Sequence, residues 1–256
     1  MKMPRLISRR LFTTGLASCL GGTRGGLAAE AAAGKKGWGG ADAELHKLFK
    51  VHWHYNWMPR GTSTQEVEFV PLIKGTPALN QAQVIVETPG VKHLLGFNEP
   101  ERESQGNVSV SEALDLWPKL EAIAEKAGLR LGSPATSSDK PGMDWFEAFM
   151  EQAKRRKLRM DFVALHWYRG RDASAFESFV TAISRSHRLP VWVTEFNGWS
   201  GGEEENHEFL KGTLRFMERS RIVERYAYFN PPKGAPHSLL AADGSLTRMG
   251  KLYSET

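Results

Sequence analysis

A repeated alternation between short apolar segments and longer amphipathic ones begins near Lys35 and most constrains how this chain can fold. The apolar segments are rich in Val, Leu, Phe and Trp, which is typical of strands buried on both faces of a parallel sheet. The pattern predicts eight strands, at residues 36–39, 51–56, 67–73, 93–98, 130–133, 161–167, 190–196 and 225–230. Five helical patterns lie between them, at residues 41–50, 112–126, 145–156, 175–186 and 204–219. Eight strands that alternate with helices predict a closed (β/α)8 TIM barrel rather than an open sheet.

The length of the chain predicts one domain. Its 256 residues, 41% of them hydrophobic, suffice for one sizeable core, and a single barrel commonly occupies such a length. No repeat, low-complexity tract or interdomain linker follows the first 33 residues, so we expect one α/β barrel at residues 34–256. The helical pattern is weakest at residues 75–90. Ser109 with Glu112 predicts a helix N-cap, and Gly128 predicts the left-handed end of that helix.

The positive charge of the chain comes from its first 33 residues. The whole sequence carries 34 Lys and Arg against 29 Asp and Glu, a formal net charge of +5. Residues 1–33 contain five of these basic residues and one acidic residue, which leaves 29 basic and 28 acidic residues in the remainder. A nearly neutral domain does not predict a nucleic-acid partner.

Paired arginines precede a mildly apolar stretch near the start of the chain. The order Ser8–Phe12, followed by apolar residues up to Leu20, is typical of a twin-arginine export signal. This stretch is shorter than the roughly 20 apolar residues of a membrane-spanning helix, and no later stretch is long and apolar enough either. We therefore expect residues 1–33 to direct export to the periplasm or the medium.

The end of this signal has two interpretations. Small residues at 26–28 and 31–33 offer cleavage sites that would release a soluble product. Residues 16–19 (Leu-Ala-Ser-Cys) resemble a lipobox, which would leave Cys19 lipidated and the domain anchored to a membrane. Because Cys19 is the only cysteine, the barrel can form no internal disulfide and has no thiol nucleophile or thiolate metal ligand.

Polar and aromatic residues gather where the predicted strands end. They do so at five strands, at residues 54–57, 97–100, 166–168, 194–197 and 228–230. The carboxyl ends of barrel strands converge on one face, and that face holds the active site in characterised enzymes of this fold. The sequence therefore predicts one site built from several strand ends.

Glu99 and Glu195 lie at the ends of the fourth and seventh predicted strands. Cleavage of a glycosidic bond needs one carboxylic acid to protonate the leaving oxygen and a second carboxylate at the anomeric carbon. A lone glutamate here would usually be a solvated loop residue, but two at matching strand ends among aromatic residues indicate a catalytic pair. We expect a separation of about 5–5.5 Å, as in retaining enzymes. We also expect Glu99 to have the more apolar surroundings and to keep its proton near neutral pH, while Glu195 stays ionised.

Several neighbours of this pair are candidates for sugar binding. Asn98 is suited to bind the hydroxyl next to the reacting carbon. His166 is either a core histidine bonded to a carbonyl or a residue that orients Glu195 or a sugar hydroxyl. Trp57 and Trp199 fall just past strand ends, where they either stack on sugar rings or pack under loops. The other tryptophans inside strand or helix patterns are expected in the core: Trp117, Trp145 and Trp192.

Other chemistries find less support in the sequence. His52 and His54 have the spacing of one strand face, but no third ligand with metal-site spacing accompanies them. There is no His-Glu-x-x-His run and no Gly-x-Ser-x-Gly elbow. We therefore expect no metal and no cofactor.

The ordered set of motifs resembles the catalytic domain of glycoside hydrolase family 128, also called the alkali-sensitive-linkage-protein-like glycosyl hydrolase domain. The motifs are Tyr55–Trp57, Gly96–Pro100, Gly132–Ala135, His166–Tyr168 and Thr194–Phe196. The resemblance covers about residues 37–252. Asn-Glu-Pro alone occurs in many barrel glycosidases, whereas the ordered set is specific.

The resemblance implies a retaining barrel enzyme of clan A that cleaves β-1,3-glucan, most simply an endo-β-1,3-glucanase. By motif position, Glu99 is the general acid/base and Glu195 the nucleophile. Two segments, Met58-Pro59 and Asn197–Trp199, depart from the family pattern and would reshape sugar subsites, which leaves endo or exo cutting open. We expect nine residues to form the substrate site: Tyr55, Asn56, Trp57, Asn98, His166, Trp167, Tyr168, Asn197 and Trp199.

The expected partner is a β-glucan polysaccharide or oligosaccharide, and the expected state is a monomer. Two alternatives stay open at this level. One is a non-catalytic glucan-binding wall protein on a decayed barrel, although binding alone needs no pair of glutamates. The other is a hydrolase or transglycosylase of a different β-glucan.

Overall fold

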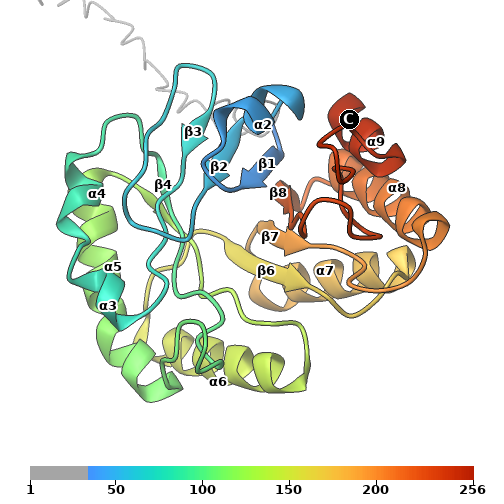
Figure 1. Ribbon diagram of the computed structural model, residues 1–256. Coiled ribbons are helices and arrows are strands. Elements are labelled where there is room, and N and C mark those ends of the chain that lie inside the picture. Colours follow the sequence, from blue (N-terminus) through green and yellow to red (C-terminus); the bar gives the residue numbers. More distant parts are fainter. Residues whose placement is uncertain (1–33) are drawn as a thin grey trace, which may run out of the picture.

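Eight parallel strands form the centre of the structure, a computed structural model that describes residues 34–256 (Figure 1). The predicted export signal and the lipobox at Cys19 lie outside the described residues. The strands are β1 (Lys36–Gly39), β2 (Trp53–Tyr55), β3 (Glu68–Phe69), β4 (His93–Leu94), β5 (Arg130–Leu131), β6 (Val163–Trp167), β7 (Val191–Phe196) and β8 (Val223–Tyr228).

Hydrogen bonding closes these strands into a barrel. Six pair in the order β3-β2-β1-β8-β7-β6, and β4 pairs with β5. A parallel bridge between Leu72 and Leu95 joins the β3 and β4 segments, and one between Gly132 and Phe162 joins β5 to β6. The predicted (β/α)8 barrel is therefore confirmed. The predicted strands at residues 67–73 and 93–98 were too long, because single bridges rather than a continuous ladder hold this side of the barrel.

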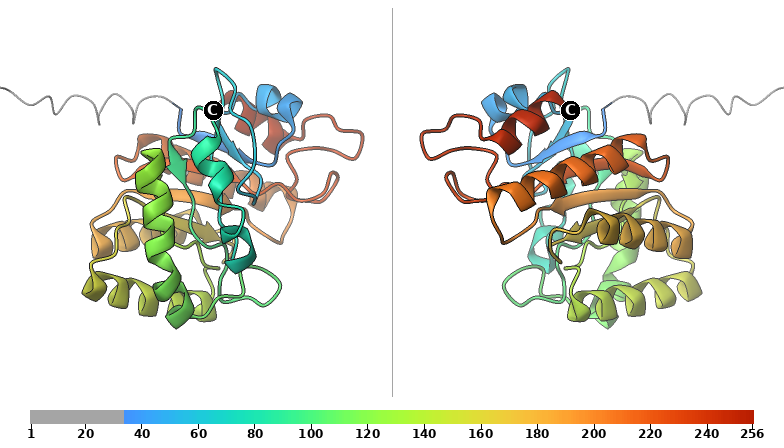
Figure 2. Two further views of the ribbon diagram at one scale, coloured as in Figure 1. Left: turned by 90° about the vertical axis from the view of Figure 1, so that its left-hand side faces the viewer. Right: turned by 90° about the vertical axis from the view of Figure 1, so that its right-hand side faces the viewer.

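Helices surround the barrel on the outside (Figures 1 and 2). None of the helices in the described part of the chain is long and apolar enough to cross a bilayer. The helices are α2 (Ala43–Leu48), α3 (Thr76–Leu79), α4 (Gln83–Glu87), α5 (Val110–Ala127), α6 (Lys140–Arg156), α7 (Ala173–His187), α8 (Glu203–Arg219) and α9 (Arg248–Glu255).

The local signals for the helix ends agree with the structure. The Ser109 hydroxyl accepts a hydrogen bond from the Glu112 N–H at 3.2 Å, and Gly128 ends α5 with φ +67°. Helix α9 was not predicted, although Met249 and Tyr253 have the i, i+4 spacing of one helix face and are both buried. Its Tyr253 hydroxyl donates to the carbonyl of Gly37 at 2.8 Å, which fixes the last helix under β1.

Two apolar clusters fill the fold. One lies inside the barrel and includes Trp53, Phe162 and Trp192, whose rings are fully buried. The other lies between the strands and the helices and includes Trp117 and Trp145, which are buried as predicted. Because side chains fill its interior, the barrel holds the strand ends rigidly.

A buried ionic network lies near the amino ends of β3 and β4. One oxygen of Glu68 is 2.7 Å from His93 Nδ1, and the other accepts from Arg225 at 2.7 Å. The guanidinium of Arg225 lies 4.4 Å from the ring centroid of Trp192. Burial raises the pKa of Glu68, but the hydrogen bond from His93 and the charge of Arg225 outweigh it and lower that pKa to about 2.

Candidate active site

A cleft of about 880 Å³ opens at the carboxyl ends of the strands. This is the face on which barrel enzymes place their chemistry. The volume lies in the range typical of small-molecule and oligosaccharide sites. The cleft is lined by Trp57, Lys74, Asn98, Glu99, Arg102, Gln105, Ser137, Ser138, Asp139, Tyr168, Arg169, Glu195, Trp199 and Phe229.

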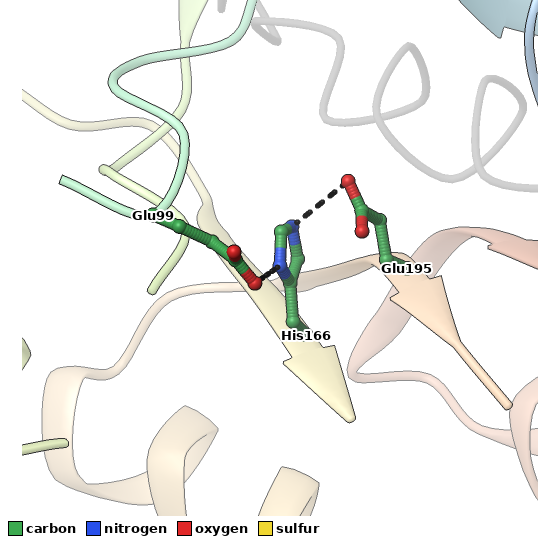
Figure 3. A group of neighbouring side chains, drawn as sticks. All are labelled: Glu99, His166 and Glu195. Atoms are coloured by element: carbon green, nitrogen blue, oxygen red, sulfur yellow. Dashed lines mark hydrogen bonds and ion pairs between the residues drawn. The ribbon is translucent and has the colours of Figure 1, made fainter. Parts of the chain in front are cut away.

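Glu99 and Glu195 lie on opposite sides of His166 in this cleft (Figure 3). His166 Nδ1 is 3.1 Å from Glu99 Oε1, and its Nε2 is 3.5 Å from Glu195 Oε1. One oxygen of each glutamate and a ring nitrogen of His166 all lie within 4.8 Å of one another. The predicted pair is therefore brought together, and His166, which is 1% exposed, bridges it.

Three aromatic side chains hold Glu195, which is 5% exposed at the end of β7. Its Oε2 accepts from the Tyr168 hydroxyl at 2.5 Å, and its Oε1 accepts from Trp57 Nε1 at 2.9 Å and from the Tyr55 hydroxyl at 3.3 Å. Burial and the charge of Glu195 raise the pKa of both tyrosines well above the usual value, so both hydroxyls keep their protons and remain donors. These hydrogen bonds fix the position of the Glu195 carboxylate in the cleft.

The surroundings of Glu99 differ from the expectation. Burial raises its pKa, but the hydrogen bond from His166, the charge of His166 and that of Arg102 outweigh burial, so the pKa lies below its usual value. The expectation that Glu99 has the more apolar environment, and a raised pKa, was therefore wrong for the free protein. Its side chain is 12% exposed, against 6% for Glu195.

His166 lies between these carboxylates, and their charges favour its protonated form. Burial lowers the pKa of His166, but the charges of Glu195 and Glu99 and the hydrogen bond to Glu99 outweigh it, so the pKa is raised. Nδ1 makes the hydrogen bond to Glu99, whereas Nε2 is buried, lies 3.5 Å from Glu195 Oε1 and makes no hydrogen bond within the described residues.

Strained backbone marks three residues of the cleft. Glu99, Trp57 and Trp199 have φ values of +41°, +58° and +60°, a region that side-chain-bearing residues rarely adopt. The Glu99 N–H donates to the carbonyl of Ala135 at 2.7 Å, which fixes the strained residue. The loop that contains Glu99 passes close to its own start at Gly106. A Cβ added to Gly106 would lie 2.6 Å from the carbonyl oxygen of Asn98 and 2.7 Å from that of Lys74. Surrounding structure thus holds the loop that carries Glu99 in place.

Six of the nine predicted substrate residues lie at the cleft or on its glutamates. Asn98, Trp57, Tyr168 and Trp199 line it, and Tyr55 and His166 contact the carboxylates from below. The Oδ1 of Asn98 is buried and has no hydrogen-bond partner among the described residues, although the side chain lines the cleft. Trp199 is 58% exposed and packs edge-on against Tyr168.

The other three predicted substrate residues have structural contacts instead. Asn56 bonds to Arg60 and Met58 within its own loop. Trp167 points to the outside of the barrel, where it packs against helix α7 in the core and donates to a loop carbonyl. Asn197 is fully buried and joins two loops through hydrogen bonds to the carbonyl of Phe229 and the N–H of Trp199. None of these three residues lines the cleft. Trp167 faces away from it because alternate residues of a strand face opposite sides, whereas the two asparagines are held by hydrogen bonds within loops.

Four charged residues that line the cleft were missed: Lys74, Arg102, Asp139 and Arg169. Arg102 lies with its Nε 3.6 Å from Glu99 Oε2 and donates to Asp139 at 2.7 Å. The sequence signal that could have identified Arg102 is its position as a basic residue three places after Glu99. Nothing in the sequence indicates that Asp139, 37 residues later, meets it.

The group Glu99, His166 and Glu195 also has the spacing of a metal site. The chemistry of the donors argues against that interpretation. A ligating imidazole must be neutral, whereas the pKa of His166 is raised and both its nitrogens face carboxylates. Glu195 Oε1 already accepts from two donors. The arrangement fits proton transfer between side chains better than metal binding.

Comparisons with known proteins agree with this geometry. The profile of the glycosyl hydrolase catalytic core family matches residues 27–253. Comparison with curated proteins gives no match. Among solved structures, a subgroup I endo-β-1,3-glucanase of glycoside hydrolase family 128 from Amycolatopsis mediterranei, in complex with laminaritriose, is 31% identical, with a TM-score of 0.75 over 86% of this chain and 98% of that one.

Two further relatives belong to other subgroups. A subgroup III curdlan-specific exo-β-1,3-glucanase from Blastomyces gilchristii is 32% identical, with a TM-score of 0.74 over 87% of this chain and 98% of that one. A subgroup II endo-β-1,3-glucanase from Sorangium cellulosum is 28% identical, with a TM-score of 0.72 over 86% and 97%. On the family profile and these similarities, the chain belongs to glycoside hydrolase family 128.

Proposed function

We propose that this protein is an exported endo-β-1,3-glucanase that cleaves its substrate by double displacement. The observation that carries the proposal is the pair Glu99 and Glu195, whose nearest oxygens lie within 4.8 Å across His166. Retaining glycosidases hold their carboxyl groups about 5–5.5 Å apart, whereas inverting enzymes leave about 6.5–9.5 Å for a water molecule. The similar enzymes act on β-1,3-glucans, which supports the substrate class.

In the first step, Glu195 attacks the anomeric carbon and the bond to the leaving sugar breaks. The three donors on Glu195 hold its carboxylate in a fixed orientation, which a nucleophile needs. Glu99 gives its proton to the leaving oxygen. Its Oε1 is engaged by His166, so Oε2 is the oxygen available for this transfer.

In the second step, Glu99 accepts a proton from water, and the water oxygen displaces Glu195 from the sugar. A lowered pKa in the free protein suits this role as base. For the first step Glu99 must be protonated. A bound glucan excludes water from the cleft, and this further burial raises the pKa of the carboxyl. His166 keeps Glu99 oriented throughout.

Endo cutting is supported by the extent of the cleft, which has lining residues on both sides of the two glutamates. A chain therefore finds contacts on each side of the scissile bond. Sugar release from laminarin, curdlan, lichenan and cellulose tests the substrate, with Glu195→Gln as the inactive control. We expect release from laminarin and curdlan, with mixed oligosaccharides as early products. Glucose alone as the early product would show exo action, and release only from lichenan or cellulose would contradict the proposal.

Export is supported by the paired arginines at residues 9 and 10 before a short apolar stretch. Replacement of both by lysine should leave the protein in the cytoplasm of a host with an intact twin-arginine system. Normal export of that variant would contradict the assignment. Metabolic labelling with a fatty acid decides whether Cys19 is lipidated.

A further inference from the structure

The two sides of the cleft differ in chemistry. Trp57, Tyr168, Trp199 and Phe229 form what we call the aromatic arm, around Glu195. The opposite side, around Glu99, is lined by Lys74, Arg102, Gln105 and Asp139, which we call the charged arm. The aromatic arm offers ring faces for stacking, whereas the charged arm offers donors and acceptors for hydroxyl groups.

The roles of the two glutamates determine which part of the substrate contacts each arm. Glu195 becomes bonded to the retained sugar, and its own hydrogen bonds come from Trp57 and Tyr168 of the aromatic arm. Glu99 delivers the proton to the departing sugar from Oε2, and Arg102 Nε lies 3.6 Å from that oxygen. The sugar that leaves therefore departs within reach of Arg102.

Arg102 is fixed in place by the first turn of α6. Its Nη2 donates to Asp139 Oδ2 at 2.7 Å. Asp139 is the N-cap of this helix, and its Oδ1 accepts from the Gly142 N–H at 3.1 Å and from the Ser137 hydroxyl at 2.6 Å. The side chains of Arg102 and Asp139 are 44% and 48% exposed, so both remain accessible to a ligand. A guanidinium has five N–H groups in a rigid fork, more than these contacts use.

We propose that Arg102 and Asp139 form a binding subsite for the leaving-group side of the glucan, and that the same subsite binds an acceptor sugar when one replaces water. The ligand is a neutral β-linked glucosyl unit. Each of its hydroxyls both donates and accepts, which matches a guanidinium donor beside a carboxylate acceptor. This inference rests on the proposed glucanase function.

Three substrates separate binding at this subsite from effects on Glu99. Laminarihexaose places sugar on the leaving side, whereas phenyl and 2,4-dinitrophenyl β-laminaribioside place none there. Arg102→Gln should lower kcat/KM for laminarihexaose about 10-fold, the loss expected from one charge-assisted hydrogen bond. For both aryl glycosides, each measured at its own optimum pH, the change should stay below about 3-fold.

The acceptor role has its own readout. Laminaribiose added to the 2,4-dinitrophenyl reaction should accept the sugar from Glu195, and wild-type protein should form the longer oligosaccharide. Arg102→Gln should need about 10-fold more laminaribiose for the same transfer. Asp139→Asn is a second variant, because asparagine is an equally good N-cap while it weakens the ion pair. Arg155→Gln is the matched control, since Arg155 pairs only with Glu151 on the exposed face of α6 among the described residues.

Each outcome decides the inference. A loss on the phenyl glycoside as large as that on laminarihexaose, with the 2,4-dinitrophenyl glycoside unaffected, would show that Arg102 acts only through Glu99. No loss on laminarihexaose would show that the leaving sugar binds elsewhere. Either result overturns the subsite, provided that the melting temperatures of the variants match that of wild type. Failure of wild-type protein to cleave any laminari-substrate would instead overturn the proposed function itself, and the subsite with it.

Discussion

His166 Nδ1 lies 3.1 Å from the carboxylate of Glu99, so an imidazole whose pKa is raised, rather than an apolar wall, faces the proposed acid/base. This contact lowers the pKa of Glu99 in the free protein. The pH dependence of kcat/KM reports the pKa values of the free enzyme. The enzyme should therefore work best on the acidic side of neutrality.

Replacement of His166 by glutamine should move the alkaline limb of that profile to higher pH. Activity falls as Glu99 loses its proton, and the variant removes the charge and the hydrogen bond that hold this pKa low. The maximal kcat/KM should also fall about 10- to 100-fold, from loss of a charge-assisted contact. His52→Gln, at an exposed position outside this cleft, is the control. An alkaline limb that stays in place or moves to lower pH would show that His166 does not set the pKa of Glu99.

Two tryptophans from the strand-end motifs should behave in opposite ways. Trp199 is 58% exposed, so Trp199→Ala should weaken binding of laminarin while the melting temperature stays close to that of wild type. Trp167 is 3% exposed in the outer core, so Trp167→Ala should cost about 3–5 kcal/mol of unfolding free energy. Thermal melts and laminarin binding of both variants check this pair. A large loss of stability in Trp199→Ala would refute its role as a platform.

The ionic network at the other end of the barrel should make the protein sensitive to acid. The pKa of Glu68 is about 2 in the folded protein against an ordinary 4.5, so its stabilising effect is complete above about pH 4.5 and is lost as pH falls toward 2. Burial also lowers the pKa of His93. The folded protein therefore loses further stability as the pH falls below 6.5, the ordinary pKa of histidine. Over this range the Glu68 contribution amounts to about 3 kcal/mol.

Urea unfolding of wild type and Glu68→Gln between pH 2 and 7 measures this effect. The variant should be less stable than wild type at pH 7, and the gap should close as the pH falls. A gap that stays constant with pH would mean that Glu68 stabilises the fold through packing alone. Glu151→Gln, on the exposed face of α6, should show little effect at any pH.

Sequence patterns predicted the barrel and its catalytic pair because both depend on local order. Glu99 follows β4 and Glu195 lies at the end of β7, and the fold brings the carboxyl ends of the strands to one face. Trp167 and Asn197 lie in the same strand-end motifs as the residues that line the cleft. The side of the strand on which a residue lies depends on the register between strands, and single bridges and bulges shift that register here. The pairing of Arg102 with Asp139 depends on how two loops meet, and no local pattern encodes it.

Azide should separate the roles of the two glutamates. Glu195→Ala should abolish ordinary turnover, and azide should restore cleavage of 2,4-dinitrophenyl β-laminaribioside with an α-glycosyl azide as product. Glu99→Ala should lose about 10²- to 10⁴-fold, chiefly on poor leaving groups, and azide should there give the β-azide by attack on the covalent intermediate. If the two variants gave the opposite anomers, the roles assigned to Glu99 and Glu195 would be refuted and would have to be exchanged.

The most direct test of the account is the anomeric configuration of the first product, followed by proton NMR during hydrolysis of laminari-oligosaccharides. Glu99 and Glu195, with oxygens within 4.8 Å, leave too little room for a water molecule between nucleophile and sugar. Double displacement predicts that the new reducing end appears first as the β-anomer and then equilibrates. A new reducing end that appears first as the α-anomer would contradict the retaining mechanism.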